Sequence, residues 1–96
     1  MMPSYELVFI LSPDVTDEEV PNAINRVSDI IKKVGGSVNE IAQWGRKKMA
    51  YPIKKFAEGN YMLAKLELKP ASIRELETSL RLSGEVLRHL LIRLDE

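Results

Sequence analysis

The residues with the clearest chemical potential are the basic ones in the stretch GRKKMAYPIKK, at positions 45–55. Five bases fall within these eleven residues: Arg46, Lys47, Lys48, Lys54 and Lys55. Arginine and lysine on a hairpin can bind phosphate groups, and the interleaved Tyr51 can stack on a base. Lysines and a proline on an edge strand also protect a sheet against aggregation. Charge alone therefore leaves nucleic-acid binding and edge protection equally open.

No residues in the sequence have the spacing of a catalytic or metal site. His89 is the only histidine, and no nucleophile or carboxylate stands at a recognisable spacing from it. We therefore interpret it as a packed or surface residue. The chain has no cysteine, which excludes a disulfide framework, a thiolate zinc site and a cysteine nucleophile. We expect a protein that is not an enzyme, without catalytic residues, metal, cofactor or small-molecule substrate.

Length and composition describe an ordinary globular protein. The chain has 96 residues, of which 45% are hydrophobic and 29% charged, and this length predicts a single domain over residues 1–96. The longest apolar run, Leu7 to Leu11, is far shorter than the ~18 residues of a membrane span. The first residues lack the features of a secretory signal. We expect a cytoplasmic protein that does not bind a membrane.

The formal net charge of zero hides an uneven distribution. Residues 1–31 contain six acids and one base, whereas residues 32–69 contain nine bases and three acids. Such asymmetry indicates one surface for a polyanion and another for a different partner.

Hydrophobic periodicity predicts the order strand, helix, strand, strand, helix, strand. The expected strands cover residues 5–11, 37–53, 61–68 and 86–94, and residues 54–60 form a loop. Capping-box patterns at Thr16 and Ser72 mark the two helices, although Pro21 would then require a later start or a kink in the first. Gly35-Gly36 ends that helix. Gly45 indicates a bulge, and Pro52 assigns its strand to an edge.

This order predicts an α+β fold of the ferredoxin-like, split βαβ type. Right-handed crossovers place two helices on one face of a four-stranded antiparallel sheet and leave the other face open. The first and third strands should be central. Tyr5, Leu7, Phe9 and Leu11 then share the helix-covered face. In the final strand, leucines occur at both parities, so its two faces stay unassigned.

The stretch from Gly45 to Lys54, Gly-x-basic-basic-Met-Ala-Tyr-Pro-Ile-Lys, resembles the signature of a ribosomal family, the sixth protein of the bacterial small subunit. The Tyr5-Glu6 opening, Gly59-x-Tyr61 and the start of the last strand are similar to the same family. The resemblance implies a structural constituent of the ribosome, a ribonucleoprotein component in translation. It also implies cooperative binding of the central domain of 16S ribosomal RNA with the eighteenth small-subunit ribosomal protein during platform assembly.

The roles expected under this resemblance divide into two groups. The RNA-binding candidates are Arg46, Lys47, Lys48, Lys54, Lys55 and Tyr51, with Arg88 and Arg93 as secondary candidates. For Tyr51, packing in the core is at least an equal possibility. The candidates for the protein partner, on the open sheet face, are Val8, Ile10, Tyr61 and Leu63. A contiguous apolar patch there would be costly to leave in water.

Two other functions are compatible with a ferredoxin-like fold. One is a small-molecule regulatory module acting as a homodimer through its sheet, although Ser12-Pro13-Asp14 makes a poor ligand loop. The other is an acylphosphatase-like enzyme, which the acids after the first strand disfavour because they would repel a phosphate.

Overall fold

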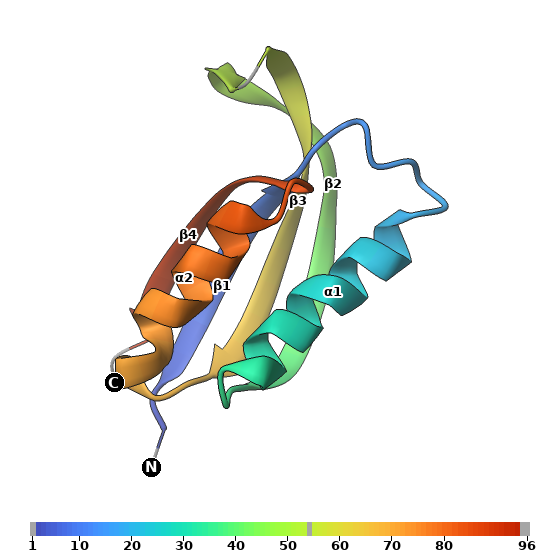
Figure 1. Cartoon of the computed structure of the whole chain (residues 1–96). Coiled ribbons are helices and arrows are strands. Elements are labelled where there is room, and N and C mark those ends of the chain that lie inside the picture. Colours follow the sequence, from blue (N-terminus) through green and yellow to red (C-terminus); the bar gives the residue numbers. More distant parts are fainter. Residues whose placement is uncertain (1, 54, 95–96) are drawn as a thin grey trace.

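A computed structural model of the chain describes residues 2–53 and 55–94. The elements follow in the order β1 (Ser4–Leu11), α1 (Val20–Lys33), β2 (Ser37–Ile53), β3 (Phe56–Glu67), η1 (Pro70–Ser72), α2 (Ile73–Leu82) and β4 (Val86–Leu94). The strands form one four-stranded antiparallel sheet in the order β2-β3-β1-β4. Both helices cover the same face of this sheet (Figure 1). The predicted ferredoxin-like fold is confirmed, with β1 and β3 central and β2 at an edge.

The core lies between the helices and the inner face of the two central strands. The inner-face residues of β1 predicted from the alternation are all buried: Tyr5, Leu7, Phe9 and Leu11. Met62, Ala64 and Leu66 of β3 stand opposite them and are also buried. The helices complete this core on the side away from the sheet. They contribute Val27 and Ile31 from α1 and Leu76 and Leu80 from α2. Removal of these side chains from water is the main force that orders the fold.

The helix starts differ from the capping-box expectation. Helix α1 begins at Val20, so Pro21 lies in the first turn, where its missing N–H costs no hydrogen bond. The Thr16 hydroxyl donates a hydrogen bond to the Glu19 carboxylate at 3.1 Å and caps no helix. Ser72 occupies the N-cap position of α2 without a side-chain cap bond. The predicted stop after α1 is confirmed, because Gly35 has a φ of +89°.

The expected loop over residues 54–60 is wrong. Strand β3 begins at Phe56, and β2 and β3 form a long hairpin in which Lys48 pairs with Glu58 and Ile53 with Phe56. Glu58-Gly59 has the composition of a turn, but Gly59 lies within β3, where its lack of a side chain lets β1 come close. A Cβ at Gly59 would overlap Ile10 Cγ2 of β1. The turn itself lacks glycine, and Lys55 adopts a φ of +75° there.

An ion pair ties α1 to the segment that leads into β4. Arg26 Nε donates a hydrogen bond to Glu85 Oε1 at 2.6 Å, and Arg26 Nη2 donates to Glu85 Oε2. This bidentate contact holds the pKa of Glu85 below its ordinary value. The pair connects residues that lie far apart in the sequence, beside the backbone hydrogen bond from Ser12 N to Glu85 O at 2.9 Å.

The close approach at Gly59 makes a stability prediction. Gly59→Ala should lower the free energy of unfolding by about 1–3 kcal/mol, because the new methyl must displace the stiff β-branched Ile10. Gly84→Ala is the matched control, since a Cβ there meets nothing within 4 Å. Urea unfolding of both variants measures the difference. Equal stabilities would contradict the close approach.

The Arg26–Glu85 pair makes a pH prediction. Because the folded-state pKa of Glu85 is lowered, the pair stabilises the fold above the ordinary carboxyl pKa. That contribution is lost as the pH falls through the lowered value. The melting temperature of the natural chain should therefore fall more steeply below about pH 4 than that of Glu85→Gln. Glu18→Gln, which removes an exposed carboxylate, should keep the natural pH dependence; a flattened profile there would argue against the pair.

Candidate nucleic-acid and protein interface

The β2–β3 hairpin projects past the end of the sheet. Strand β1 ends at Leu11, which pairs with Asn60 of β3, so the hairpin beyond that point pairs only with itself. Figure 1 shows this two-stranded extension rising away from the helices. Because it covers no core, its side chains are free to be charged.

The basic residues of the hairpin are gathered on this extension. Arg46, Lys47, Lys48 and Lys55 are all exposed. Lys54, also an RNA-binding candidate, lies outside the described residues. Within residues 2–53 and 55–94, none of the four described bases forms an ion pair with a carboxylate. The structure therefore groups four of the predicted RNA contacts, and their role in binding stays a prediction.

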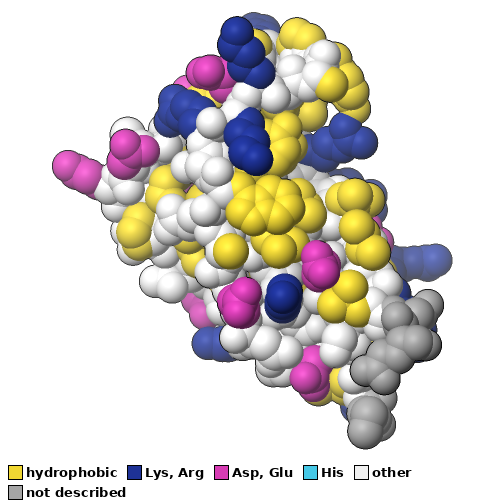
Figure 2. Space-filling view, turned by 180° about the vertical axis from the view of Figure 1, so that it is seen from behind, with side chains coloured by type: hydrophobic (Ala, Val, Ile, Leu, Met, Phe, Trp, Pro, Cys, Tyr) yellow, Lys and Arg dark blue, Asp and Glu magenta, His cyan; other side chains and the backbone are white. Residues whose placement is uncertain are grey.

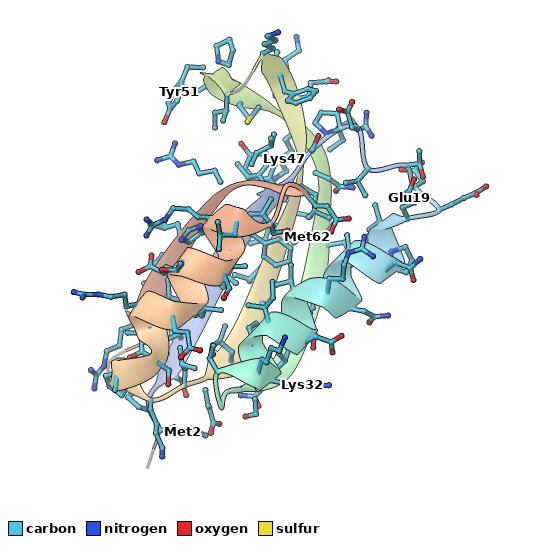
Figure 3. All side chains as sticks on the ribbon, viewed as in Figure 1. Met2, Glu19, Lys32, Lys47, Tyr51 and Met62 are labelled. Carbon is cyan, nitrogen blue, oxygen red and sulfur yellow. The ribbon has the colours of Figure 1, made fainter. Side chains whose placement is uncertain are left out.

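Two aromatic side chains accompany these bases. Tyr51 is 55% exposed, so the possibility that it packs in the core is wrong. It lies near the hairpin tip (Figure 3) and contacts Arg88. Trp44, which the sequence reasoning missed, is 47% exposed, and the Lys47 ammonium lies 5.5 Å from its ring centroid. The sequence does offer a signal for Trp44 as a candidate, because it directly precedes the bulge at Gly45 and the basic residues 46–48.

The sheet face opposite the helices carries the expected apolar patch. Val8 pairs with Leu63, and Ile10 with Tyr61, so all four partner candidates share this face. Figure 2 shows this side with hydrophobic side chains across its middle and basic ones toward the hairpin end. Ile10 is only 7% exposed, so in the free chain it supports the patch more than it offers a contact.

The register of β4 resolves the faces that the sequence left unassigned. Leu90 stands opposite Val8, and Ile92 opposite Glu6, so both face the open side. They are 56% and 45% exposed and extend the patch to the sheet edge. Leu91 stands opposite Leu7 and packs against the core. The sequence reasoning missed Leu90 and Ile92 because pairing, not composition, determines their orientation.

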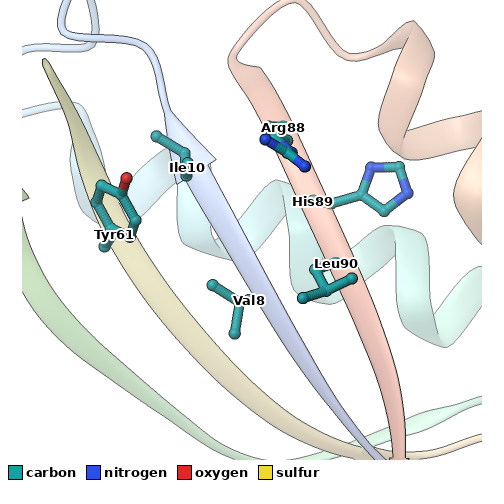
Figure 4. A pocket seen from close by; sticks show the side chains of 6 residues that line it. All are labelled: Val8, Ile10, Tyr61, Arg88, His89 and Leu90. Carbon is teal, nitrogen blue, oxygen red and sulfur yellow. The ribbon is translucent and has the colours of Figure 1, made fainter. Parts of the chain in front are cut away.

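A shallow hollow of about 200 Å³ lies on this face. It is lined by Val8, Ile10, Tyr61, Arg88, His89 and Leu90 (Figure 4). The hollow combines an apolar floor with a guanidinium at its rim, so it suits an apolar side chain that carries a polar or acidic neighbour.

The two secondary arginines are widely separated. Arg88 pairs with Ile10 near the hairpin, whereas Arg93 pairs with Tyr5 at the other end of β1. Five residues of strand separate them by about 17 Å. Arg93 also shares the parity of the helix-covered face. Only Arg88 is therefore part of the surface that the hairpin bases form.

Comparison with known proteins identifies the family. The model of the family described as ribosomal protein S6 matches residues 4–93. The chain is 42% identical to small ribosomal subunit protein bS6 of Caldanaerobacter subterraneus over 99% of its length and 100% of the relative's. It is 39% identical to that of Moorella thermoacetica, over 99% and 97%. The chain belongs to the ribosomal protein S6 family.

A solved structure supports the same assignment. The crystal structure of 30S ribosomal protein S6 from Thermotoga maritima is 35% identical and superposes with a TM-score of 0.88. The likeness covers 98% of this chain and 89% of that one. The resemblance seen in the sequence is confirmed. The chain is a small-subunit ribosomal protein, and its expected location on the ribosome in the cytoplasm follows from the family.

The lone histidine of the sequence stands near a carboxylate of α2. His89 Nε2 lies 3.2 Å from Glu77 Oε2 of α2, and Figure 4 shows the imidazole pointing toward the helix side of β4. Within the described part of the chain, no group of three or more acids or histidines is placed to hold a metal ion. Nor does the described part contain a helix with the length and apolarity to span a membrane.

The assignment of β4 side chains can be tested with two adjacent leucines. Leu91→Ala should lower the free energy of unfolding by about 2 kcal/mol, because Leu91 packs against the core. Leu90→Ala should cost less than about 1 kcal/mol, because Leu90 faces solvent on the open side. Chemical denaturation gives both values. A larger loss for Leu90 would reverse the assignment of the two faces.

Proposed function

We propose that this S6-family chain binds the central domain of 16S ribosomal RNA through the β2–β3 hairpin and the eighteenth small-subunit ribosomal protein through the open sheet face. The observation that carries this proposal is the cluster of exposed bases at the end of the hairpin, next to an uncovered apolar patch. Both surfaces lie outside the core, so the fold leaves them available.

The hairpin supports an RNA role through its charge. Its described bases lack carboxylate partners within residues 2–53 and 55–94, so their full charge is available to phosphates. Each phosphate that they neutralise releases a counterion, which favours binding at low salt. The contacts are to backbone more than to base edges, and recognition depends on RNA shape. Tyr51 and Trp44 add rings on which an unpaired base can stack.

The open face supports a protein partner. Val8, Leu63, Leu90 and Ile92 form an apolar patch with Glu6 on the same face. Burying such a patch against another protein is favourable. Glu6 stands opposite the exposed Lys65 on this face, so a partner there meets charges of both signs. The chain itself has a formal net charge of zero. The partner therefore supplies much of the charge that binds RNA, and the isolated chain binds RNA weakly.

A gel shift against a central-domain RNA fragment, with and without the eighteenth protein, tests the proposal. Tight binding is expected only with both proteins. In that mixture, Lys47→Gln/Lys48→Gln should weaken binding and reduce the slope of log K against log salt by roughly 2. The matched control is Lys32→Gln/Lys33→Gln, which removes the same charge from the far end of α1 (Figure 3).

The same assay tests the protein surface. Val8→Asp should abolish the effect of the eighteenth protein, because it buries a charge in the apolar contact. Leu82→Asp, on the 81% exposed end of α2, should leave that effect intact. If RNA binds under neither condition, the hairpin bases are an edge guard. A homodimer that small molecules stabilise would then favour the regulatory-module alternative.

A further inference from the structure

A contact joins the two edges of the sheet. Tyr51 belongs to β2 and Arg88 to β4, and the sheet order β2-β3-β1-β4 places two strands between them. Arg88 Nη1 nevertheless donates a hydrogen bond to the Tyr51 hydroxyl, and the guanidinium carbon lies 5.7 Å from the Tyr51 ring centroid. The hairpin tip must therefore lean back over the open face toward β4.

The sheet ladder alone does not fix this orientation. The β2–β3 pairing is interrupted between Gln43 and Gly45 and again between Lys48 and Ile53. The first interruption has Gly45 at a φ of +92°, and Tyr51 lies within the second. Bulges bend and twist a strand locally. An extension of two strands with two such breaks can take several directions, so a contact outside the ladder is needed to select one.

Arg88 also belongs to the open face. It stands opposite Ile10 in the register and lines the hollow with Val8, Tyr61 and Leu90. Figure 4 shows its side chain at the rim next to Ile10. A protein that fills the hollow therefore meets the same guanidinium that holds the hairpin.

We propose that Arg88 is a positioning residue that, with Tyr51, clasps the basic hairpin in its RNA-binding orientation and links occupation of the open face to that orientation. A planar guanidinium suits this role because it can stack on a ring and donate to a hydroxyl together. A partner in the hollow immobilises Arg88, and the clasp then holds the lysines before RNA arrives. The clasp between Arg88 and Tyr51 concerns the free chain alone. The link between the open face and the hairpin orientation rests on the proposed function.

Hydrogen exchange in the free protein tests the clasp without any RNA. Arg88→Met should raise amide exchange at hairpin residues 46–51 by roughly threefold, the effect of losing an exposed cation–π contact. Exchange in β1 should stay unchanged. Tyr51→Phe keeps the ring but loses the hydroxyl, so its effect should be smaller. Arg74→Met, on the exposed surface of α2, is the matched control. Unchanged exchange in Arg88→Met would overturn the clasp.

A double-mutant cycle separates the clasp from a direct phosphate contact by Arg88. Tyr51→Leu, Arg88→Met and the double variant are compared for hairpin exchange and for RNA affinity in the presence of the eighteenth protein. The clasp predicts that the double variant equals either single variant, because one contact is lost in each. Additive losses in affinity with unaltered exchange would instead make Arg88 an independent RNA contact.

The two proposals fail in different ways. If the natural chain binds no RNA with its partner, the proposed function fails while the exchange experiment still decides the clasp. If RNA and partner bind but the partner's effect on RNA affinity is the same in Arg88→Met as in the natural chain, the link between the two surfaces is overturned. If the eighteenth protein still binds Arg88→Met but raises its RNA affinity less than that of the natural chain, the link is supported.

Discussion

Burial of one face of β1 and β3 beneath the two helices is the constraint on which the rest of the molecule depends. Phe9 and Met62 stand opposite each other on that face and are fully buried. Once alternation commits these side chains inward, Val8 and Leu63 must point to the other face. The position of Val8 and Leu63 on the open surface is therefore a direct consequence of core formation. Among residues 2–53 and 55–94 no third layer covers this surface, because α1 and α2 both lie on the other face of the sheet (Figure 1).

The same constraint explains why charge is concentrated on the hairpin. Beyond Leu11 no central strand supports β2 and β3, so apolar side chains there would stay in water. Lys47 and Lys48 are exposed there, so their charges keep their hydration at little cost in folding free energy. Together they produce a strong positive electrostatic potential. The candidate RNA-binding surface thus begins where the core ends. The apolar patch and the cationic extension lie close together because β2 and β3 continue beyond the end of β1.

Much of this fold could be predicted from the sequence, because periods of two and 3.6 residues reveal which faces are buried. Pro52 and Gly45 correctly indicated an edge strand and a bulge. The start of β3 at Phe56 could not be predicted, because Glu58-Gly59 has the composition of a turn. Gly59 is instead a strand residue that leaves room for the side chain of Ile10. The contact between Tyr51 and Arg88 was equally hidden, because it depends on the bend of a hairpin across the sheet. Composition located the basic candidates, whereas strand register was needed to find Leu90 and Ile92.

The exposed indole at the base of the hairpin has a practical consequence. Trp44 is the only tryptophan of the chain, and it lies beside Lys47 near the basic hairpin and not in the core. The protein therefore contains a single indole fluorophore, which can be excited apart from its three tyrosines and whose emission responds to whatever covers that surface. Events at the hairpin can therefore be followed through this emission without a label.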